Sequence, residues 1–120
     1  MSLAIVNGSA SPVGSVAINA QTGTTYTFAA SDSFNTLVTL SNASAIAVTI
    51  PTNATTAFPV GTVLNFAQVG AGQATVSGAS GVTIVSVGAT AATPKTRVQY
   101  SAGSAIQTSA NNWLVIGDIA

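Results

Sequence analysis

Ile46-Ala47-Val48-Thr49-Ile50-Pro51 is the stretch that decides the fold class. Ile46, Val48 and Ile50 alternate with smaller residues, and this period of two places the branched side chains on one face of an extended strand. Pro51 ends the run because it has no N–H to donate to a sheet ladder. The stretch therefore predicts a β-strand with one buried face.

Runs of the same kind recur from Gln21 onward, separated by Gly, Pro, Asn and Ser, and they predict short strands about ten residues apart. The predicted strands are 25–28, 37–40, 46–50, 63–69, 74–76, 82–87, 96–100, 105–108 and 113–116. We therefore expect an all-β fold, a small β-sandwich or barrel-like module of about eight or nine short antiparallel strands. No period of 20 to 50 residues indicates a solenoid.

Three connections and one strand allow more detailed predictions. Residues 63–69 are apolar on both faces, which predicts a central strand that is covered on both sides. Gly70-Ala71-Gly72 and residues 78–81 are typical of hairpin turns, and the residues Ala110-Asn111-Asn112 predict a turn between the last two strands. Gly70 and Gly72 are not interpreted as part of a phosphate-binding loop, because no lysine follows them.

The chain divides into two parts. Residues 1–20 have scattered apolar side chains, among them Leu3, Ile5 and Val6, and we expect an extended N-terminal arm. Residues 21–120 form the all-β module. Its large aromatic residues are predicted to be structural core anchors, with a sugar-binding platform as the alternative. These anchors are Phe28, Phe58, Tyr100 and Trp113.

Charge is scarce. Asp32, Lys95, Arg97 and Asp118 are the charged residues, 3% of the chain, against about 25% in ordinary soluble domains. Two basic residues are too few for sequence-independent binding to nucleic acid, so no nucleic-acid partner is expected. No apolar stretch reaches the roughly 18 residues of a membrane span, and no secretory signal is present at the start, so no membrane partner is expected. A neutral, apolar chain instead predicts a large interface and poor solubility as a free monomer.

The residue types needed for catalysis and metal binding are missing. The sequence has no histidine, cysteine or glutamate, and Asp32 and Asp118 lie far apart in it. We therefore predict a protein that is not an enzyme, with no catalytic residues, no cofactor and no metal site. Lys95 and Arg97 are expected to share one face of the 96–100 strand, either solvated or against an acidic partner.

Several short motifs together resemble a β-rich domain of tailed-bacteriophage virion proteins, often found near the ends of tail fibres. The resemblance covers most of residues 21–120. The motifs that carry it are Thr22-Gly23-Thr24-Thr25-Tyr26-Thr27, Val38-Thr39-Leu40-Ser41-Asn42-Ala43-Ser44, Val48-Thr49-Ile50-Pro51, Phe58-Pro59-Val60-Gly61-Thr62, Gly70-Ala71-Gly72-Gln73, Gly81-Val82-Thr83-Ile84, Arg97-Val98-Gln99-Tyr100-Ser101 and Trp113-Leu114-Val115-Ile116-Gly117-Asp118.

The resemblance implies a structural role in the virion. Only about 20 residues precede the module, and a short chain of this kind resembles a capsid decoration, or cement, protein. That likeness implies a homotrimer on the outer surface of the head, bound to the major capsid protein, with Leu3, Ile5 and Val6 as the capsid-contact arm. The alternative is a tail-fibre or baseplate tip that contacts a host glycan through the loops around 53–58 or Asn111. An ice-binding or surface-coat role would rest on the Thr and Ala content, but no regularly repeated Thr array is visible.

Overall fold

The computed structural model describes residues 15–87 and 91–120, and its regular elements there are β-strands apart from one short 3-10 helix, η1 (Ala30–Ser33). In chain order the strands are β1 (Ala17–Gln21), β2 (Thr25–Thr27), β3 (Thr36–Leu40), β4 (Ile46–Ile50), β5 (Val63–Gln68), β6 (Ala74–Gly78), β7 (Thr83–Ser86), β8 (Ala102–Ser109) and β9 (Asn112–Gly117). The prediction of an all-β chain is confirmed.

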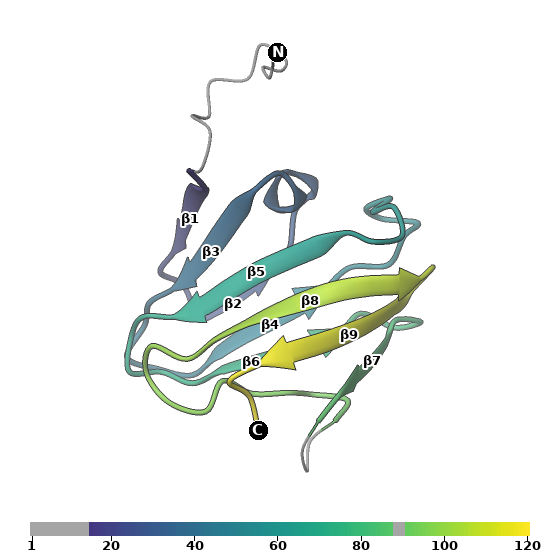
Figure 1. Cartoon of the computed structure of the whole chain (residues 1–120). Helices are drawn as coiled ribbons and strands as arrows, with labels where there is room; N and C mark the ends of the chain where they lie inside the picture. Colours follow the sequence, from purple (N-terminus) through teal and green to yellow (C-terminus); the bar gives the residue numbers. More distant parts are fainter. Residues whose placement is uncertain (1–14, 88–90) are drawn as a thin grey trace.

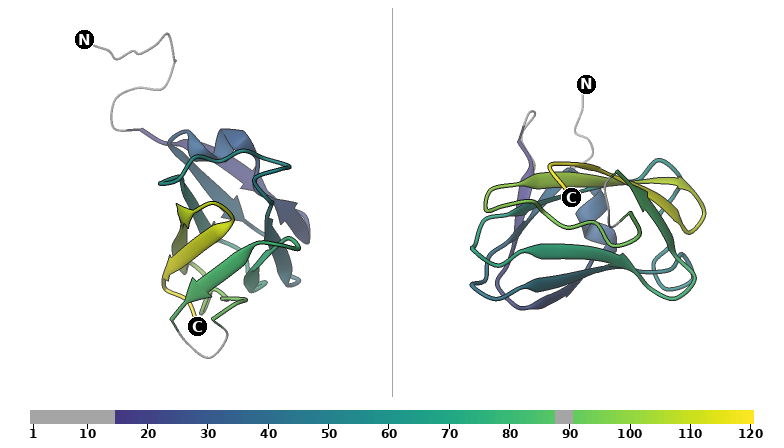
Figure 2. Two further views of the ribbon diagram at one scale, coloured as in Figure 1. Left: turned by 90° about the vertical axis from the view of Figure 1, so that its right-hand side faces the viewer. Right: turned by 90° about the horizontal axis from the view of Figure 1, so that it is seen from below.

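The chain passes repeatedly from one sheet to the other. β1, β3 and β5 lie in a six-stranded sheet, whereas β2, β4 and β6 form a three-stranded sheet behind it (Figures 1 and 2). Within each set, neighbouring strands pair in parallel. The prediction of antiparallel strands is wrong here, because these connections cross between the sheets and bring each new strand back in the same direction.

This winding forms a short coil with turns of unequal length. Ala17 pairs with Thr36 and Leu37 pairs with Asn65, so equivalent positions are 19 residues apart in one turn and 28 in the next. The longer turn contains the loop between β4 and β5. A fixed sequence period is therefore absent, which is why no period of 20 to 50 residues is visible in a chain that nevertheless winds as a short coil.

Glycines allow the corners of the coil to stack closely. Gly70-Ala71-Gly72 joins β5 to β6 in the other sheet, so this segment is a corner and not the predicted hairpin. The N–H of Gly72 donates to the carbonyl oxygen of Asn42 at 2.7 Å, and a Cβ at Gly72 would lie 1.9 Å from the carbonyl oxygen of Ser44. Residues 78–81 also lead from one sheet to the other, so the second predicted hairpin is absent as well.

A hairpin completes the six-stranded sheet. β8 and β9 pair antiparallel, as predicted from the Ala110-Asn111-Asn112 turn, in which Asn111 has a positive φ of 60°. The hairpin lies between β5 and β7 in the strand order β1-β3-β5-β8-β9-β7. β5 therefore has strands on both sides, and its predicted central position is confirmed.

The core lies between the two sheets. Phe28, Phe58 and Trp113 are buried there, as expected of core anchors. Tyr100 is 75% exposed, and its assignment to the core is wrong. Residue 100 has a positive φ of 72°, which breaks the extended alternation. Residues 95–101 form no strand, although isolated bridges at Lys95 and Thr96 and backbone hydrogen bonds of Tyr100 and Ser101 to Gln68 join them to the sheets.

The boundary of the predicted arm also needs correction. β1 begins at Ala17 and pairs with β3 along its whole length, so residues 17–20 belong to the module. They are drawn into the sheet because β3 offers a free edge on that side. The predicted capsid-contact residues of the arm are Leu3, Ile5 and Val6, and all three lie outside the described residues.

Candidate assembly interface

The side of the six-stranded sheet that faces away from the core, here called the outer face, is largely aliphatic over its middle, with Thr83 and Asn112 at one end. One row across it joins four strands in register and consists entirely of aliphatic residues, namely Val63, Ile106, Leu114 and Val85. Val63 is 40% exposed and Val85 is 52% exposed. The outward face of a sheet that meets water ordinarily has polar side chains, so this row departs from the usual pattern.

A second row crosses five strands beside it. Its members, in order from β1 to β9, are Ile18, Leu37, Asn65, Ser104 and Ile116. The two isoleucines at its ends are exposed, and the two polar residues lie in its middle. A third row consists of small uncharged residues, Ala20, Thr39, Ala67 and Ala102. None of the residues in the three rows is charged.

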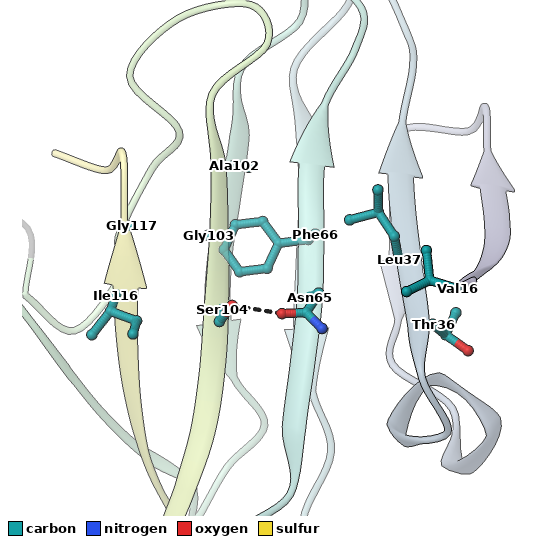
Figure 3. Close-up of a pocket in the computed structure, with 10 residues that line it drawn as sticks. All are labelled: Val16, Thr36, Leu37, Asn65, Phe66, Ala102, Gly103, Ser104, Ile116 and Gly117. Carbon is teal, nitrogen blue, oxygen red and sulfur yellow. Dashed lines mark hydrogen bonds between the residues drawn. The ribbon is translucent and has the colours of Figure 1, made fainter. Parts of the chain in front are cut away.

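A shallow groove runs along the middle of the outer face (Figure 3). It has a volume of about 460 Å³, and Leu37 and Ile116 flank it. In its floor the hydroxyl of Ser104 donates to Oδ1 of Asn65 at 2.6 Å. Gly103 contributes no side chain, and the ring of Phe66 lies so close that a Cβ on Gly103 would be 2.8 Å from Cζ. The groove is therefore largely apolar, and its polar side chains are the hydrogen-bonded pair and Thr36.

The aliphatic surface continues past the ends of β3 and β5. A second groove shares Val63 and Asn65 with the outer face, and it is also lined by Phe34 and Val60. Phe34 is 73% exposed and Val60 is 63% exposed. The two grooves adjoin at Asn65, and the second groove has a mixed lining, with Ser33, Asn35 and Thr62 beside the exposed Phe34 and Val60.

The outward side of the three-stranded sheet is the opposite in character. Its two rows are Thr25, Ala47, Thr75 and Thr27, Thr49, Ser77. Five of these six side chains bear a hydroxyl group, as expected of a sheet surface in water. The contrast shows that the aliphatic outer face is a feature of one sheet and not a general consequence of the apolar composition.

None of the charged residues belongs to the three rows of the outer face, but Lys95 is bridged to Thr75 of the other sheet, and the N–H of Asp118 donates to the carbonyl oxygen of Ala102 at the edge of the third row. Asp32 is buried, and its carboxylate accepts hydrogen bonds from Asn19 Nδ2 at 2.9 Å, from the N–H of Ala29 at 2.8 Å and from the hydroxyl of Tyr26. Burial of Tyr26, followed by its hydrogen bond to Asp32, raises the pKa of the phenol to about 12. This cluster ties β1, β2 and η1 together, so its role is structural.

The second aspartate forms an exposed ion pair. Arg97 Nε lies 2.7 Å from Asp118 Oδ1, and the Ser101 hydroxyl donates to Asp118 Oδ2 at 2.6 Å. The guanidinium, and then the hydroxyl, lower the pKa of Asp118. Backbone hydrogen bonds join both Lys95 and Arg97 to the C-terminal segment, at Ala120 and Asp118, and Lys95 is also bridged to Thr75. The grouping of the two basic side chains on one face stays a prediction, and the acidic group that Arg97 meets is Asp118 of the same chain.

The structure brings together the two loops predicted for a glycan site. Oδ1 of Asn111 accepts a hydrogen bond from the N–H of Asn53 at 2.8 Å. The buried side-chain amide of Gln107 lies 2.7 Å from Oδ1 of Asn53. Both loops therefore lie at one end of the molecule, although 58 residues separate them in the sequence.

Sequence reasoning missed most of the outer face. Ile18 was expected in the arm, and Val85 and Ile116 were expected in strands without a face being assigned. The one signal was the run 63–69, whose apolar residues on both faces predict cover on both sides. The second sheet covers one of these sides, whereas Val63 on the other side is exposed. Nothing in the described residues supplies the second cover.

No protein-family model matches the chain, and no curated protein matches it. Among the described residues, no cluster of His, Cys, Asp or Glu has the size needed to hold a metal ion. The part of the chain that the structure describes also contains no helix with the length and hydropathy needed to cross a membrane.

Proposed function

We propose that this chain is a non-enzymatic structural protein of a tailed-phage particle, acting as a capsid decoration protein on the outer surface of the head. The observation that carries the proposal is the continuous, uncharged outer face of the six-stranded sheet. Exposed apolar surfaces of this extent are typical of sites where another molecule binds. A protein that works inside an assembly has such a surface covered.

The side chains support a role without catalysis. The sequence has no histidine, cysteine or glutamate to act as a general base. Of its two carboxylates, Asp32 is bound by three donors and Asp118 is paired with Arg97. Each accepts a hydrogen bond from a hydroxyl group, Asp32 from Tyr26 and Asp118 from Ser101, but the sequence has no histidine that could take the proton from that hydroxyl.

The proposed partners are further copies of the chain, as a homotrimer, and the major capsid protein. The resemblance of the sequence motifs to phage virion domains supports this location. Leu3, Ile5 and Val6 are proposed to contact the capsid, because an extended apolar segment can add as a strand to an exposed sheet edge. A small number of residues then provides many main-chain hydrogen bonds.

Cosedimentation with undecorated phage heads tests the proposal. Full-length protein is expected to sediment with the heads, whereas a variant lacking residues 1–14 is expected to remain in the supernatant. The deletion ends before β1, so the sheet is kept, and circular dichroism checks that the module is folded. Undiminished binding of the truncated protein would contradict the arm contact, and failure of the full-length protein to bind would contradict the decoration role.

A tail-fibre or baseplate tip is the second candidate, favoured by the contact between Asn53 and Asn111. Receptor-binding residues are commonly grouped on loops at one end of a β scaffold. Binding of labelled protein to host cells that is lost in a variant with Asn53 and Asn111 both changed to Ala would favour this role. Saturable binding to heads together with no binding to cells would exclude it.

Ice binding is a third candidate, and one observation of the structure favours it. The sequence contains no regular Thr repeat, but strand pairing places hydroxyl-bearing residues side by side in two rows of the three-stranded sheet. One of these rows contains Thr27 and Thr49. Thermal hysteresis that is lost in Thr49→Lys would favour ice binding, and a full-length protein without thermal hysteresis would exclude it.

A further inference from the structure

We propose that the outer face of the six-stranded sheet is covered in solution by the same face of a second copy of this chain. This inference rests on the proposed structural role. Because a face that meets the same face of another copy closes a pair, it proposes a dimer in solution in place of the homotrimer. It concerns the described residues alone and is independent of the arm contact with the capsid.

The absence of charged residues from the three rows favours a second copy of the chain over a charged partner. The three rows contain no charged residue, so two identical faces meet without like-charge repulsion. The same absence leaves nothing to pair with an acidic or basic partner surface. The nearest matching chemistry is an uncharged aliphatic surface, and the chain itself provides one.

The size of the face is sufficient for a specific interface. Six strands about 4.8 Å apart, each offering about 17 Å of length, give a flat footprint of roughly 400 Å². Side-chain relief and the adjoining Phe34 and Val60 enlarge this area, so two faces together bury on the order of 1,000 Å². That area is the lower bound for a stable, specific association between proteins.

The relief of the face suits self-association. Ile18 and Ile116 are exposed at the two ends of the second row, and the groove with Asn65 in its floor lies between Leu37 and Ile116. In a symmetric pair, a ridge of each copy meets the groove of the other, which is the usual form of an isologous contact. Two facing sheets would then enclose a core about 10 Å thick, as the two sheets within one copy do.

Asn65 adds specificity to this aliphatic contact. Its Oδ1 accepts from Ser104, whereas its Nδ2 has no hydrogen-bond partner among the described residues. Buried in a contact between copies, that N–H group needs an acceptor, so the alignment that provides one is preferred. A single polar group in an apolar interface selects one register at some cost in affinity.

Sedimentation equilibrium tests the proposal with charge substitutions on opposite sheets. Ile18→Lys and Ile116→Lys place a charge on the outer face at exposed positions, and Thr25→Lys places the same charge on the hydroxyl face. We expect the unaltered chain and Thr25→Lys to associate at micromolar concentration. Either isoleucine variant should raise the dissociation constant about 100-fold, because burying an unpaired ammonium group is unfavourable. A monomeric unaltered chain, or association unaffected by both isoleucine variants, would overturn the proposal.

Cysteine labelling gives a measurement that does not depend on a change of charge. The chain contains no cysteine, so Ile18→Cys and Thr25→Cys each provide a single thiol. Alkylation of Ile18→Cys should slow as protein concentration rises, whereas alkylation of Thr25→Cys should not. Slow alkylation of Ile18→Cys at every concentration in a monomeric protein would show that the chain covers its own face, and it would overturn the proposal.

The two proposals fail separately. If the chain is monomeric but the isoleucine variants no longer sediment with heads, the face binds the capsid and the second copy is excluded. If the chain associates through the face but never binds heads, the self-contact holds and the decoration role is contradicted.

Discussion

Phe58 and Trp113 meet edge to face, with ring centroids 5.6 Å apart and ring planes at 88°. Phe58 lies in the loop between β4 and β5, whereas Trp113 lies in β9. The contact therefore joins the parallel coil to the hairpin that completes the six-stranded sheet. Both side chains are buried, so the pair holds the parallel coil against the hairpin of β8 and β9.

Truncation of this contact should weaken the whole domain. Trp113→Ala removes a buried indole and leaves a cavity, and it is expected to lower the free energy of unfolding by about 3–5 kcal/mol. Urea denaturation measures the change. Tyr100→Ala serves as the control, because the exposed ring loses few contacts and the expected change is within about 0.5 kcal/mol. Equal effects of the two substitutions would contradict the assignment of the core.

Gly72 should tolerate no side chain. In Gly72→Ala the new Cβ meets the Ser44 carbonyl oxygen of the preceding corner, and we expect a loss of about 3 kcal/mol in the free energy of unfolding. Gly23→Ala is the matched control, since a Cβ at residue 23 would lie 3.7 Å from the nearest atom. That variant should be unchanged or up to about 1 kcal/mol more stable. A stable Gly72→Ala protein would contradict the stacking of the corners.

The two aspartates should differ sharply. In Asp32→Asn the amide nitrogen must face a donor, because both carboxylate oxygens of Asp32 accept hydrogen bonds. We expect the free energy of unfolding to fall by about 3 kcal/mol. Asp118→Asn breaks an exposed pair and should have a much smaller effect. Thermal unfolding of both variants checks the difference, and the reverse order would contradict the structural role of Asp32.

Stability should fall in strong alkali through Tyr26. Its pKa is raised from 10.0 to about 12 in the folded chain, so the protonated phenol favours folding. That contribution is fully present below pH 10 and is lost as the pH rises toward about 12. Urea denaturation between these values should show a downward slope that is reduced in Tyr26→Phe. An equal slope in both proteins would show that another group is responsible.

Local patterns in the sequence predicted local structure well. Ile46, Val48 and Ile50 alternate as the two-residue period requires, and all three are buried in β4. The Ala110-Asn111-Asn112 turn was also predictable, because asparagine adopts a positive φ more readily than most residues. In both cases the information lies within a few neighbouring residues.

Relationships between distant strands were not predictable in the same way. The glycines of the corner at 70–72 were expected in a hairpin, but the reason for them lies in the preceding turn of the coil, where a Cβ at Gly70 would meet Asn42 and a Cβ at Gly72 would meet Ser44. Parallel pairing of β1, β3 and β5 leaves no fixed period when the turns differ in length. Such contacts depend on which strands become neighbours, and short-range patterns do not contain that information.

The outer face was hidden for a similar reason. A strand such as β5, apolar on both faces, predicts cover on both sides but does not say what provides the second cover. Ile18 and Ile116 belong to one surface only because β1 and β9 enter the same sheet. The scarcity of charged residues was visible in the composition. The gathering of aliphatic side chains on one face could be seen only from the strand order.

The copy number of this chain in purified phage particles tests the central claim most directly. Quantitative mass spectrometry with isotope-labelled peptides gives the number relative to the major capsid protein. A decoration protein should be present in hundreds of copies per particle, whereas a tail tip would be present in a handful. Absence of the chain from intact particles would contradict a structural role in the virion.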